Sequence, residues 1–500
     1  MRYISLLAIS SLLFFSCGPG GKTSVNTINP NNCFCVDSSQ GTSLCPDIPH
    51  EIDKTMLPGS GVAYKSVLTT KIQPPFDLFS WQSFVALNWP ALANGTADTT
   101  SSILTNSSSL RVWEYYPLAD TVFKPLGGLM KLVLKPGDLK AAKQLYQSTA
   151  FADDFTISNQ FFEADGSTLI DKNLNYVLYE ERINSDEWQY INQHDLRTEA
   201  GQLLYVNTVG PVTLPSGTYT GQYGKSGGPV GAIEIKASWR ILDPSKGDDT
   251  TRYYHQQAEI TIGSQYTWSG KQLQFIATVG LVGFHIIHKT QMFEREIWST
   301  FEQIDNVPDD LLEAHYQHQY SFYNPVCFSC PVNQRPDSVN GKLAMWNDTP
   351  PYAAAYGIVG KNEAGRDTGT FGTQVIREFP VFASTDSINK IFQAKLAGTV
   401  WANYKLIGSQ WFKASTDAPG GPIPPKAPAR LANTTLETYD QNFASCTTCH
   451  GFAYIAGGGT DSTSSALYKS DFSFLFRKAA HPSSNVLGQK ARVPAPARKK

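Results

Sequence analysis

An excess of charge of either sign is missing from this 500-residue sequence. Its 41 lysines and arginines nearly balance 43 aspartates and glutamates, for a formal net charge of −2. Proteins that bind nucleic acids usually carry a basic face. The glycine-rich loops that cradle phosphates, G-x-x-x-x-G-K-[ST] and G-x-G-x-x-G, are missing as well. The sequence therefore predicts neither a nucleic acid nor a nucleotide as a partner.

The apolar run near the N-terminus, residues 4–15, lacks the length needed to span a bilayer. It follows Arg2 and ends at Ser16 and Cys17, an arrangement typical of a bacterial lipoprotein signal, and no periodic pattern continues it as a buried helix would. We expect residues 1–16 to be a signal peptide and Cys17 to be lipidated. Residues 17–72, rich in Gly, Pro, Ser, Thr and Asn, are predicted to be a flexible tether and lead-in.

A C-x-x-C-H motif lies near the C-terminus, at residues 446–450. Two thiols three residues apart can each bond a vinyl group of one porphyrin, and the adjoining histidine can coordinate the iron from the proximal side. With eight cysteines and nine histidines in the chain, chance would produce this motif roughly 0.002 times. The motif predicts one covalent haem c, attached through Cys446 and Cys449, with His450 as the proximal iron ligand.

A thioredoxin-like dithiol, a structural disulfide and half of a zinc site are the other interpretations of this spacing. The 50 residues after His450 contain no cysteine and only His481, so a second pair of zinc ligands is missing from them. Thr434 to Glu437 match a capping box, which predicts a short helix leading to Cys446. Apolar residues around the motif are expected either to form a haem wall or to be ordinary core, namely Phe452, Tyr454, Phe472, Phe474, Leu475 and Phe476.

The sixth iron ligand is less clear, because the last of the five methionines, Met345, precedes the motif. Small electron-carrying c-type cytochromes usually take a methionine that follows the motif. The alternatives are a water-occupied or open position, or one of the following residues: His285, His288, Met292, Met345 and His481. His285 and His288 are three apart, so on a strand they point to opposite faces and at most one can reach a given pocket.

Five further cysteines remain, at positions 33, 35, 45, 327 and 330. In an oxidising compartment the simplest pairing is Cys327 with Cys330 and one disulfide among Cys33, Cys35 and Cys45, with one thiol unassigned. A metal cluster at the first three is the less favoured alternative.

The fold class predicted is mixed and β-dominated, with a central antiparallel β sandwich or barrel and a small helical C-terminal haem segment. Residues 233–241 place Ile, Ala and Trp at every second position, which is typical of a strand with one buried face. Residues 76–90 suit either a buried helix or a strand pair, and residues 388–404 an amphipathic helix with Asp386 as N-cap. We predict a β-rich domain at 73–380, a helical haem-bearing segment at 381–482 and a disordered tail at 483–500.

Several stretches resemble exported bacterial proteins known as "cytochrome c family protein". They are residues 80–89, 280–290, 297–302, 401–404 and the 431–435 lead into Cys446. The resemblance covers most of residues 75–480. It implies one c-type haem on a long β-rich chain, with Cys446, Cys449 and His450 as the haem-binding residues, and it implies no particular reaction.

The first functional hypothesis is one-electron transfer by a c-type cytochrome tethered to the membrane, with a redox protein as partner. A haem-linked oxidoreductase or peroxidase-like enzyme whose β domain binds a substrate is the second, and a haem-binding sensor or structural lipoprotein is the third. The lipoprotein signal and the haem motif agree, because c-type haem is attached outside the bacterial cytoplasm. We expect the protein in the bacterial cell envelope, lipid-anchored and either periplasm-facing or at the outer membrane.

Overall fold

The structure is a computed structural model that describes the chain except for both ends and several internal segments. It describes residues 44–53, 56–57, 68–105, 109–123, 143–145, 164, 166–220, 228–293, 295–309, 319–327, 329–336, 345–350, 352–362, 364–412, 426–458 and 466–479. Outside these ranges lie the predicted signal peptide, most of the predicted tether, the predicted tail, and the residues Cys17, Cys33, Cys35 and His481.

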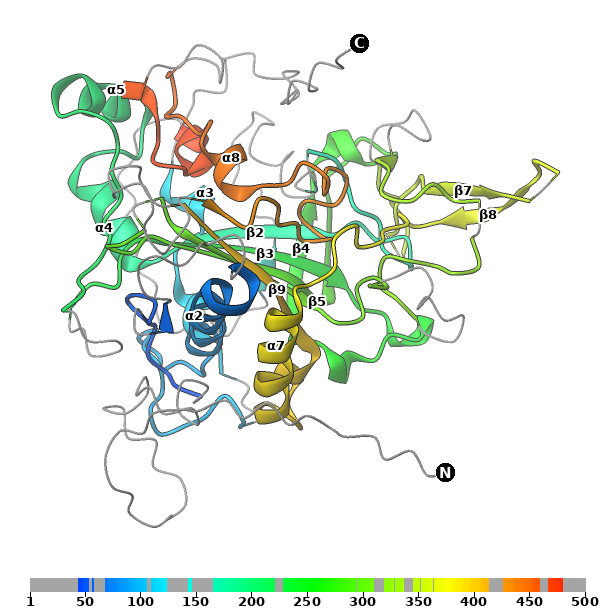
Figure 1. Ribbon diagram of the computed structural model, residues 1–500. Helices are drawn as coiled ribbons and strands as arrows, with labels where there is room; N and C mark the ends of the chain where they lie inside the picture. The colour runs from blue at the N-terminus through cyan, green and yellow to red at the C-terminus, as the bar shows by residue number, and fades with distance from the viewer. Residues whose placement is uncertain are drawn as a thin grey trace, which may run out of the picture.

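One eight-stranded sheet organises the described part of the chain (Figure 1). Its strands are β1 (Lys143–Leu145), β2 (Leu178–Ile183), β3 (Ile233–Ile241), β4 (His255–Ile262), β5 (Leu273–His288), β6 (Ile297–Gln303), β9 (Tyr404–Phe412) and β10 (Lys426–Ala427). The order is β1-β4-β5-β6-β9-β10, with β3 paired to both β2 and β5. Every pair is antiparallel except β1 with β4.

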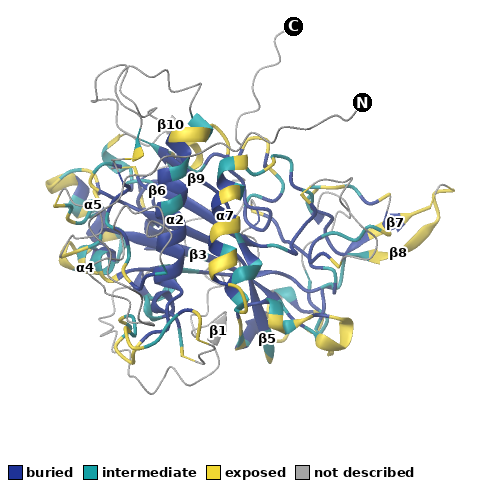
Figure 2. Cartoon of the chain, turned by 60° about the horizontal axis from the view of Figure 1, so that its bottom comes forward, coloured by how far each residue is buried: buried dark blue, intermediate teal, exposed yellow. Residues whose placement is uncertain are grey.

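The antiparallel, β-rich prediction is confirmed, whereas the sandwich or barrel is wrong. The sheet does not close, and the other described strands, β7 (Ile358–Lys361) and β8 (Asp367–Phe371), form a separate hairpin that projects from the body (Figures 1 and 2). Alternation along a strand shows which of its faces is buried but not what covers that face. Here helices cover one face, so no second sheet is needed.

The described α-helices are α2 (Gln73–Leu87), α3 (Ala119–Val122), α4 (Ser185–Gln193), α5 (Glu199–Thr208), α7 (Ala383–Lys395) and α8 (Cys446–His450). The open choice for residues 76–90 is decided in favour of a helix, α2. It begins with prolines in its first turn, where a missing N–H costs nothing. Figure 2 shows α2 buried along most of its length, beside α7, with both helices packed on the sheet. A helix buried on all sides carries apolar residues all round, so it lacks the one-sided pattern of a surface helix.

Aromatic rings join α2 to its neighbours. Trp81 stacks on Phe392 of α7 with ring centroids 4.8 Å apart, and meets Phe301 of β6 edge-on at 5.1 Å. Phe76 stacks on Trp411 of β9 at 3.7 Å. We call the side of the sheet that packs against α2 and α7 the helix-covered face.

The period-two pattern of β3 is confirmed. Ile233, Ile235, Ala237 and Trp239 lie in the main core on the helix-covered face. The intervening residues point to the other side, where Ser238 Oγ lies 2.7 Å from Thr435 Oγ1. Residues from the segments 430–458 and 466–479 lie over that second side, which we call the C-terminal face. Polar residues of β3, β5 and β6 point toward it.

The sixteen-residue strand β5 pairs with β3, β4 and β6. Its pairing with β3 shifts register beside Gly283, between the residues opposite Ser238 and Trp239, so β5 has a β-bulge there. A Cβ atom at Gly283 would lie 2.2 Å from Thr435 Oγ1. Gly283 therefore lets residues 433–435 lie directly on the sheet.

The predicted helix over residues 388–404 is confirmed only in its first half. α7 runs from Ala383 to Lys395, and Asp386 forms an i,i+4 ion pair with Lys390 instead of capping the helix. Gly398 then adopts a left-handed φ of +83°, which ends the helical path. Tyr404 begins β9, a central strand that the sequence pattern did not reveal.

The predicted disulfide between Cys327 and Cys330 is confirmed. Both residues are buried against Ile358 and Phe371, at the β7–β8 hairpin. Cys45 is also disulfide-bonded, and its partner is outside the described residues.

Candidate functional site

The cysteines of the C-x-x-C-H motif lie on the single turn of α8, over the C-terminal face near β9 (Figure 1). Residues three apart on a helix share a face, so both thiols point to the same side. Cys446 is half-buried and Cys449 is exposed. Gln410 of β9 holds the start of this turn, because its Oε1 accepts a hydrogen bond of 3.0 Å from the Thr447 N–H. A side chain of the sheet thus satisfies a helix-start N–H that has no partner within the helix.

The histidine of the motif, His450, is held by its Nδ1 atom. Nδ1 lies 2.8 Å from the carbonyl oxygen of Phe472. A carbonyl only accepts, so Nδ1 carries the hydrogen and Nε2 keeps a lone pair. The ring lies against Trp298 of β6 and Phe474, with centroids 4.3 Å and 4.9 Å away. An imidazole oriented by such a bond and by packing resembles a metal-binding histidine, whose second nitrogen usually donates to a carbonyl or carboxylate.

The protonation state of His450 also suits metal binding. Burial lowers its pKa to about 4, the hydrogen bond to Phe472 acts in the opposite direction, and the positive charge of Lys236 lowers it further. The imidazole is therefore neutral near pH 7, the form in which histidine binds metals.

An unusual turn presents the Phe472 carbonyl to His450. Asp471 and Phe472 both have left-handed backbone conformations, with φ of 53° and 69°. For residues other than glycine this costs on the order of 1–3 kcal/mol each, and such residues cluster at functional sites. Asp471 is fixed by an ion pair with Lys289 and by accepting a 2.7 Å hydrogen bond from Leu214 N–H. These contacts hold the turn in place.

The predicted helix leading to Cys446 is wrong, because residues 434–443 form turns. Asn433 Oδ1 accepts from the N–H and the hydroxyl of Thr435, and Glu437 Oε2 accepts from the Asn433 N–H at 2.8 Å. Asn and Thr side chains that bond to nearby backbone groups compete with helix formation. The capping box implied that Glu437 accepts from the Thr434 N–H, whereas Glu437 accepts from the Asn433 N–H and the Thr434 N–H bonds to Glu302.

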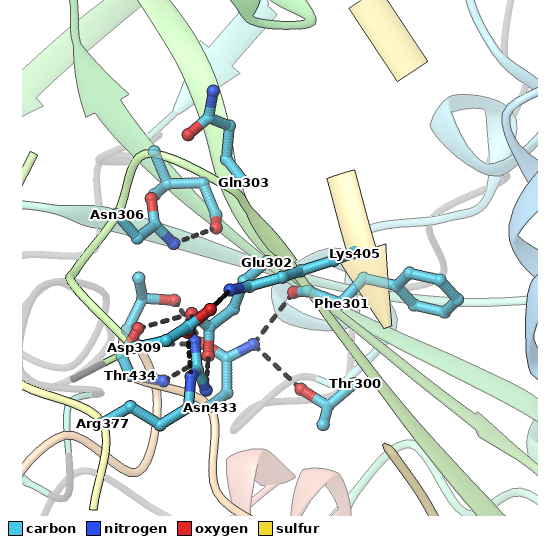
Figure 3. A network of polar contacts seen from close by, with 12 residues as sticks. Thr300, Phe301, Glu302, Gln303, Asn306, Asp309, Arg377, Lys405, Asn433 and Thr434 are labelled. Atoms are coloured by element: carbon cyan, nitrogen blue, oxygen red, sulfur yellow. Dashed lines mark hydrogen bonds and ion pairs between the residues drawn. The ribbon is translucent and has the colours of Figure 1, made fainter. Parts of the chain in front are cut away.

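A buried ion-pair network ties this turn to the sheet (Figure 3). The Glu302 carboxylate of β6 accepts hydrogen bonds from Arg377 at 2.8 Å, from the Thr434 N–H at 2.7 Å and from the Thr434 hydroxyl at 2.6 Å. Arg377 also contacts Asp309, which pairs with Lys405 of β9. The approach to the motif is thereby anchored to two neighbouring strands.

Of the apolar residues that the sequence placed around the motif, only some lie near His450. Phe474 contacts its ring and Phe472 supplies the carbonyl. Leu475 and Phe476 instead lie in a separate core with residues of α4 and α5. Phe452 is 51% exposed. Sequence proximity to the motif did not distinguish these three situations.

His285 lies on the C-terminal face, and His288 lies on the helix-covered face, as their spacing predicted. His285 is directly opposite Lys236 of β3 and Thr300 of β6. His288 meets Phe79 of α2, with ring centroids 5.4 Å apart, and its Nε2 lies 2.8 Å from the Val230 carbonyl oxygen.

The methionine candidates lie elsewhere. Met345 bonds through its N–H and carbonyl to the Tyr176 hydroxyl. Its neighbour Trp346 packs against Phe275, at the far end of β5 from His285. Ten residues of strand separate Phe275 from His285, roughly 33 Å at 3.3 Å per residue. Met292 packs into the cluster of Phe76 and Trp411 under the helix-covered face.

Three buried glutamates form a cluster that the sequence did not reveal. Glu187 is fully buried, and Glu234 and Glu296 are nearly so. Both Glu187 carboxylate oxygens and one of each other glutamate have no hydrogen-bond partner. The three come from distant segments, so no local spacing could indicate them. No group of three or more His, Cys, Asp or Glu side chains in the described ranges is arranged to hold a metal ion.

Protons neutralise this cluster. Burial raises the pKa of Glu234 to about 7, the neighbouring Ser473 and Glu187 side chains oppose the rise, and the charges of Glu181 and Asp471 add to it. Burial and the charge of Glu234 also raise the pKa values of Glu187 and Glu296, and the charge of Asp471 raises both further. The positive charge of Lys289 opposes the rise at Glu296.

The contribution of Glu234 to stability should therefore fall as the pH rises from about 4.5 to about 7. In this window folded Glu234 holds its proton more tightly than the unfolded chain does, because the ordinary pKa of glutamate is 4.5 and the folded value is about 7. This group alone lowers the free energy of unfolding by up to about 1.4 kcal/mol per pH unit in that window. The buried histidines, whose pKa values burial lowers below 6.5, act in the opposite direction. In urea unfolding at pH 5, 6 and 7, the free energy of unfolding should therefore change by a more positive amount per pH unit in Glu234→Gln than in wild type.

Asp249→Asn is the control for this measurement. Hydrogen bonds from Thr251 lower the pKa of Asp249 below 3.8, so it titrates below the window and its replacement should leave the pH dependence unchanged. Equal slopes for wild type and Glu234→Gln would contradict the prediction.

No protein-family model, curated protein or solved structure matches this chain. The function of the site therefore has to be inferred from its residues.

Proposed function

We propose that this protein is a c-type cytochrome, tethered to the membrane of the bacterial cell envelope, that passes single electrons to and from a redox partner protein. One haem is attached through Cys446 and Cys449 and coordinated by His450, as in the exported cytochrome c family that the sequence resembles. The observation that carries the proposal is the 2.8 Å contact between His450 Nδ1 and the Phe472 carbonyl. It leaves Nε2 as a metal-binding atom in a motif that also supplies two thiols on one side of α8.

The surrounding residues fit that group. When bound, the haem supplies an iron centre that changes its charge by one electron. The Phe472 carbonyl fixes the tautomer and orientation of His450 and makes Nε2 more basic. Trp298 and Phe474 exclude water from the ring, and limited solvent access is one of the factors that set a haem potential. Cys449 is exposed, so the site reaches the surface that a redox partner can approach.

The membrane tether in this proposal is lipid-based. It rests on Cys17 after the apolar segment 4–15, with residues 17–72 as the lead-in. Among the described helices, none has the length and apolar character to cross a bilayer.

The test is a potentiometric titration of the protein produced with a c-haem attachment system. We expect a visible spectrum of covalent haem that titrates reversibly with one electron, about 59 mV per tenfold change in the ratio of oxidised to reduced protein. Deleting residues 1–16 is the control, because a chain kept in the cytoplasm should carry no covalent haem. Exported protein without haem would contradict the proposal. Peroxide turnover with carbon monoxide binding would favour the haem-linked enzyme instead, and carbon monoxide binding without turnover the sensor.

A further inference from the structure

We propose that His285 is the second axial ligand of the iron at His450. This inference rests on the proposed function and adds to it the residue that closes the sixth coordination position. It selects one of several candidates that the sequence left open.

The position of His285 follows from strand register. His285 is paired with Thr300, and Ile287 with Trp298, so His285 and Trp298 are diagonal neighbours on the C-terminal face. Such neighbours lie roughly 7–8 Å apart, within reach of long side chains. The His450 ring lies on Trp298, with centroids 4.3 Å apart. The two imidazoles therefore share one side of the sheet and one aromatic neighbour.

The Nε2 atom of His285 is buried without a hydrogen-bond partner, in a residue that is 7% exposed. Leaving a buried polar atom without a partner costs about 1–3 kcal/mol, so such atoms call for an explanation. Glu437 Oε2 lies 3.6 Å from this atom, beyond hydrogen-bond distance. That oxygen already accepts from the Asn433 N–H. A metal ion would supply the partner that this nitrogen lacks.

The other candidates fit less well. His288 also has a buried ring nitrogen without a hydrogen-bond partner, Nδ1, but it faces the opposite side of β5 from His450, and its Nε2 is paired with the Val230 carbonyl oxygen. Met345 is held by Tyr176, and Met292 packs under the helix-covered face. His285 is thus the described candidate that shares a face with His450.

Two histidine ligands would leave no open position on the iron. Small molecules such as carbon monoxide or peroxide then cannot bind without displacing a side chain, so the site suits electron transfer better than catalysis. The inference therefore bears directly on the choice between a carrier and an enzyme.

The experiment compares His285→Ala with His288→Ala, two buried histidines of the same strand. Wild type and His288→Ala should show a six-coordinate, low-spin haem that does not bind carbon monoxide. His285→Ala should become high-spin and bind one carbon monoxide per reduced haem, and added imidazole should restore the low-spin spectrum. Electron paramagnetic resonance of the oxidised wild type should show two imidazole ligands, a measurement that needs no variant to fold.

Two outcomes would overturn the inference alone: a low-spin His285→Ala without added imidazole, or a wild type that binds carbon monoxide at once. His285→Met provides a further check, because a His/Met pair raises the potential of a c-type haem above that of a His/His pair. An unchanged potential in His285→Met would also count against His285. A wild type without covalent haem is a different result, since it removes the proposed function itself.

Discussion

Replacing both Cys446 and Cys449 with alanine is expected to abolish covalent haem entirely. The two thioether bonds are the only attachments that survive denaturation, because coordination by His450 is lost when the chain unfolds. A haem stain on a denaturing gel should therefore be strong for wild type and missing for the double variant. Both cysteines lie at or near the surface, so their replacement leaves no large cavity.

The chain contains its own matched control for this experiment. Cys327 and Cys330 have the same spacing, but a proline follows them in place of a histidine, and they form a disulfide. Replacing both with alanine should leave the haem stain unchanged. A stain that persists in the Cys446→Ala, Cys449→Ala variant would refute covalent attachment at this motif.

Glu302→Ala should lower the free energy of unfolding by about 3–5 kcal/mol. The Glu302 and Arg377 side chains are 0% and 2% exposed, so removal of the carboxylate leaves a guanidinium in the interior without its main partner. The N–H and hydroxyl of Thr434 lose their acceptor as well. Urea unfolding followed by far-ultraviolet circular dichroism measures the change in the free energy of unfolding.

An exposed ion pair provides the comparison for Glu302. Lys390 and Asp386 lie 2.7 Å apart on α7, with side chains 74% and 49% exposed. Surface pairs of this kind contribute little, so Lys390→Ala should change the free energy of unfolding by no more than about 0.5 kcal/mol. Similar losses for Glu302→Ala and Lys390→Ala would show that the network in Figure 3 does not stabilise the fold.

Strand β3 was predictable, because its signal is local: apolar residues at every second position mark a half-buried strand. Strand β9 was not predicted from the sequence pattern. The Cys327–Cys330 disulfide followed from spacing alone. It was not predictable that the sheet stays open and that α2, rather than a second sheet, covers one of its faces. What covers a face depends on contacts between residues distant in sequence.

In the candidate site, too, residues with a local signal could be predicted and contacts between distant segments could not. The motif indicates Cys446, Cys449 and His450 on its own, and the spacing of His285 and His288 already placed them on opposite faces. The carbonyl partner of His450 could not be predicted, because it depends on the left-handed turn at Phe472. The Glu187 cluster was equally hidden, since its members meet only after the chain has folded.

The shortness of α8 sets the order of events along the chain. A helix of five residues is far too short to form in isolation, because its nucleation is unfavourable. Its first turn depends on Gln410, which is in place only after β9 has joined the sheet. Until then nothing holds residues 446–450 as a helical turn. Under the proposed function, a newly exported chain would present the motif to an attachment enzyme before the sheet forms, and docking of α8 would follow as a later step.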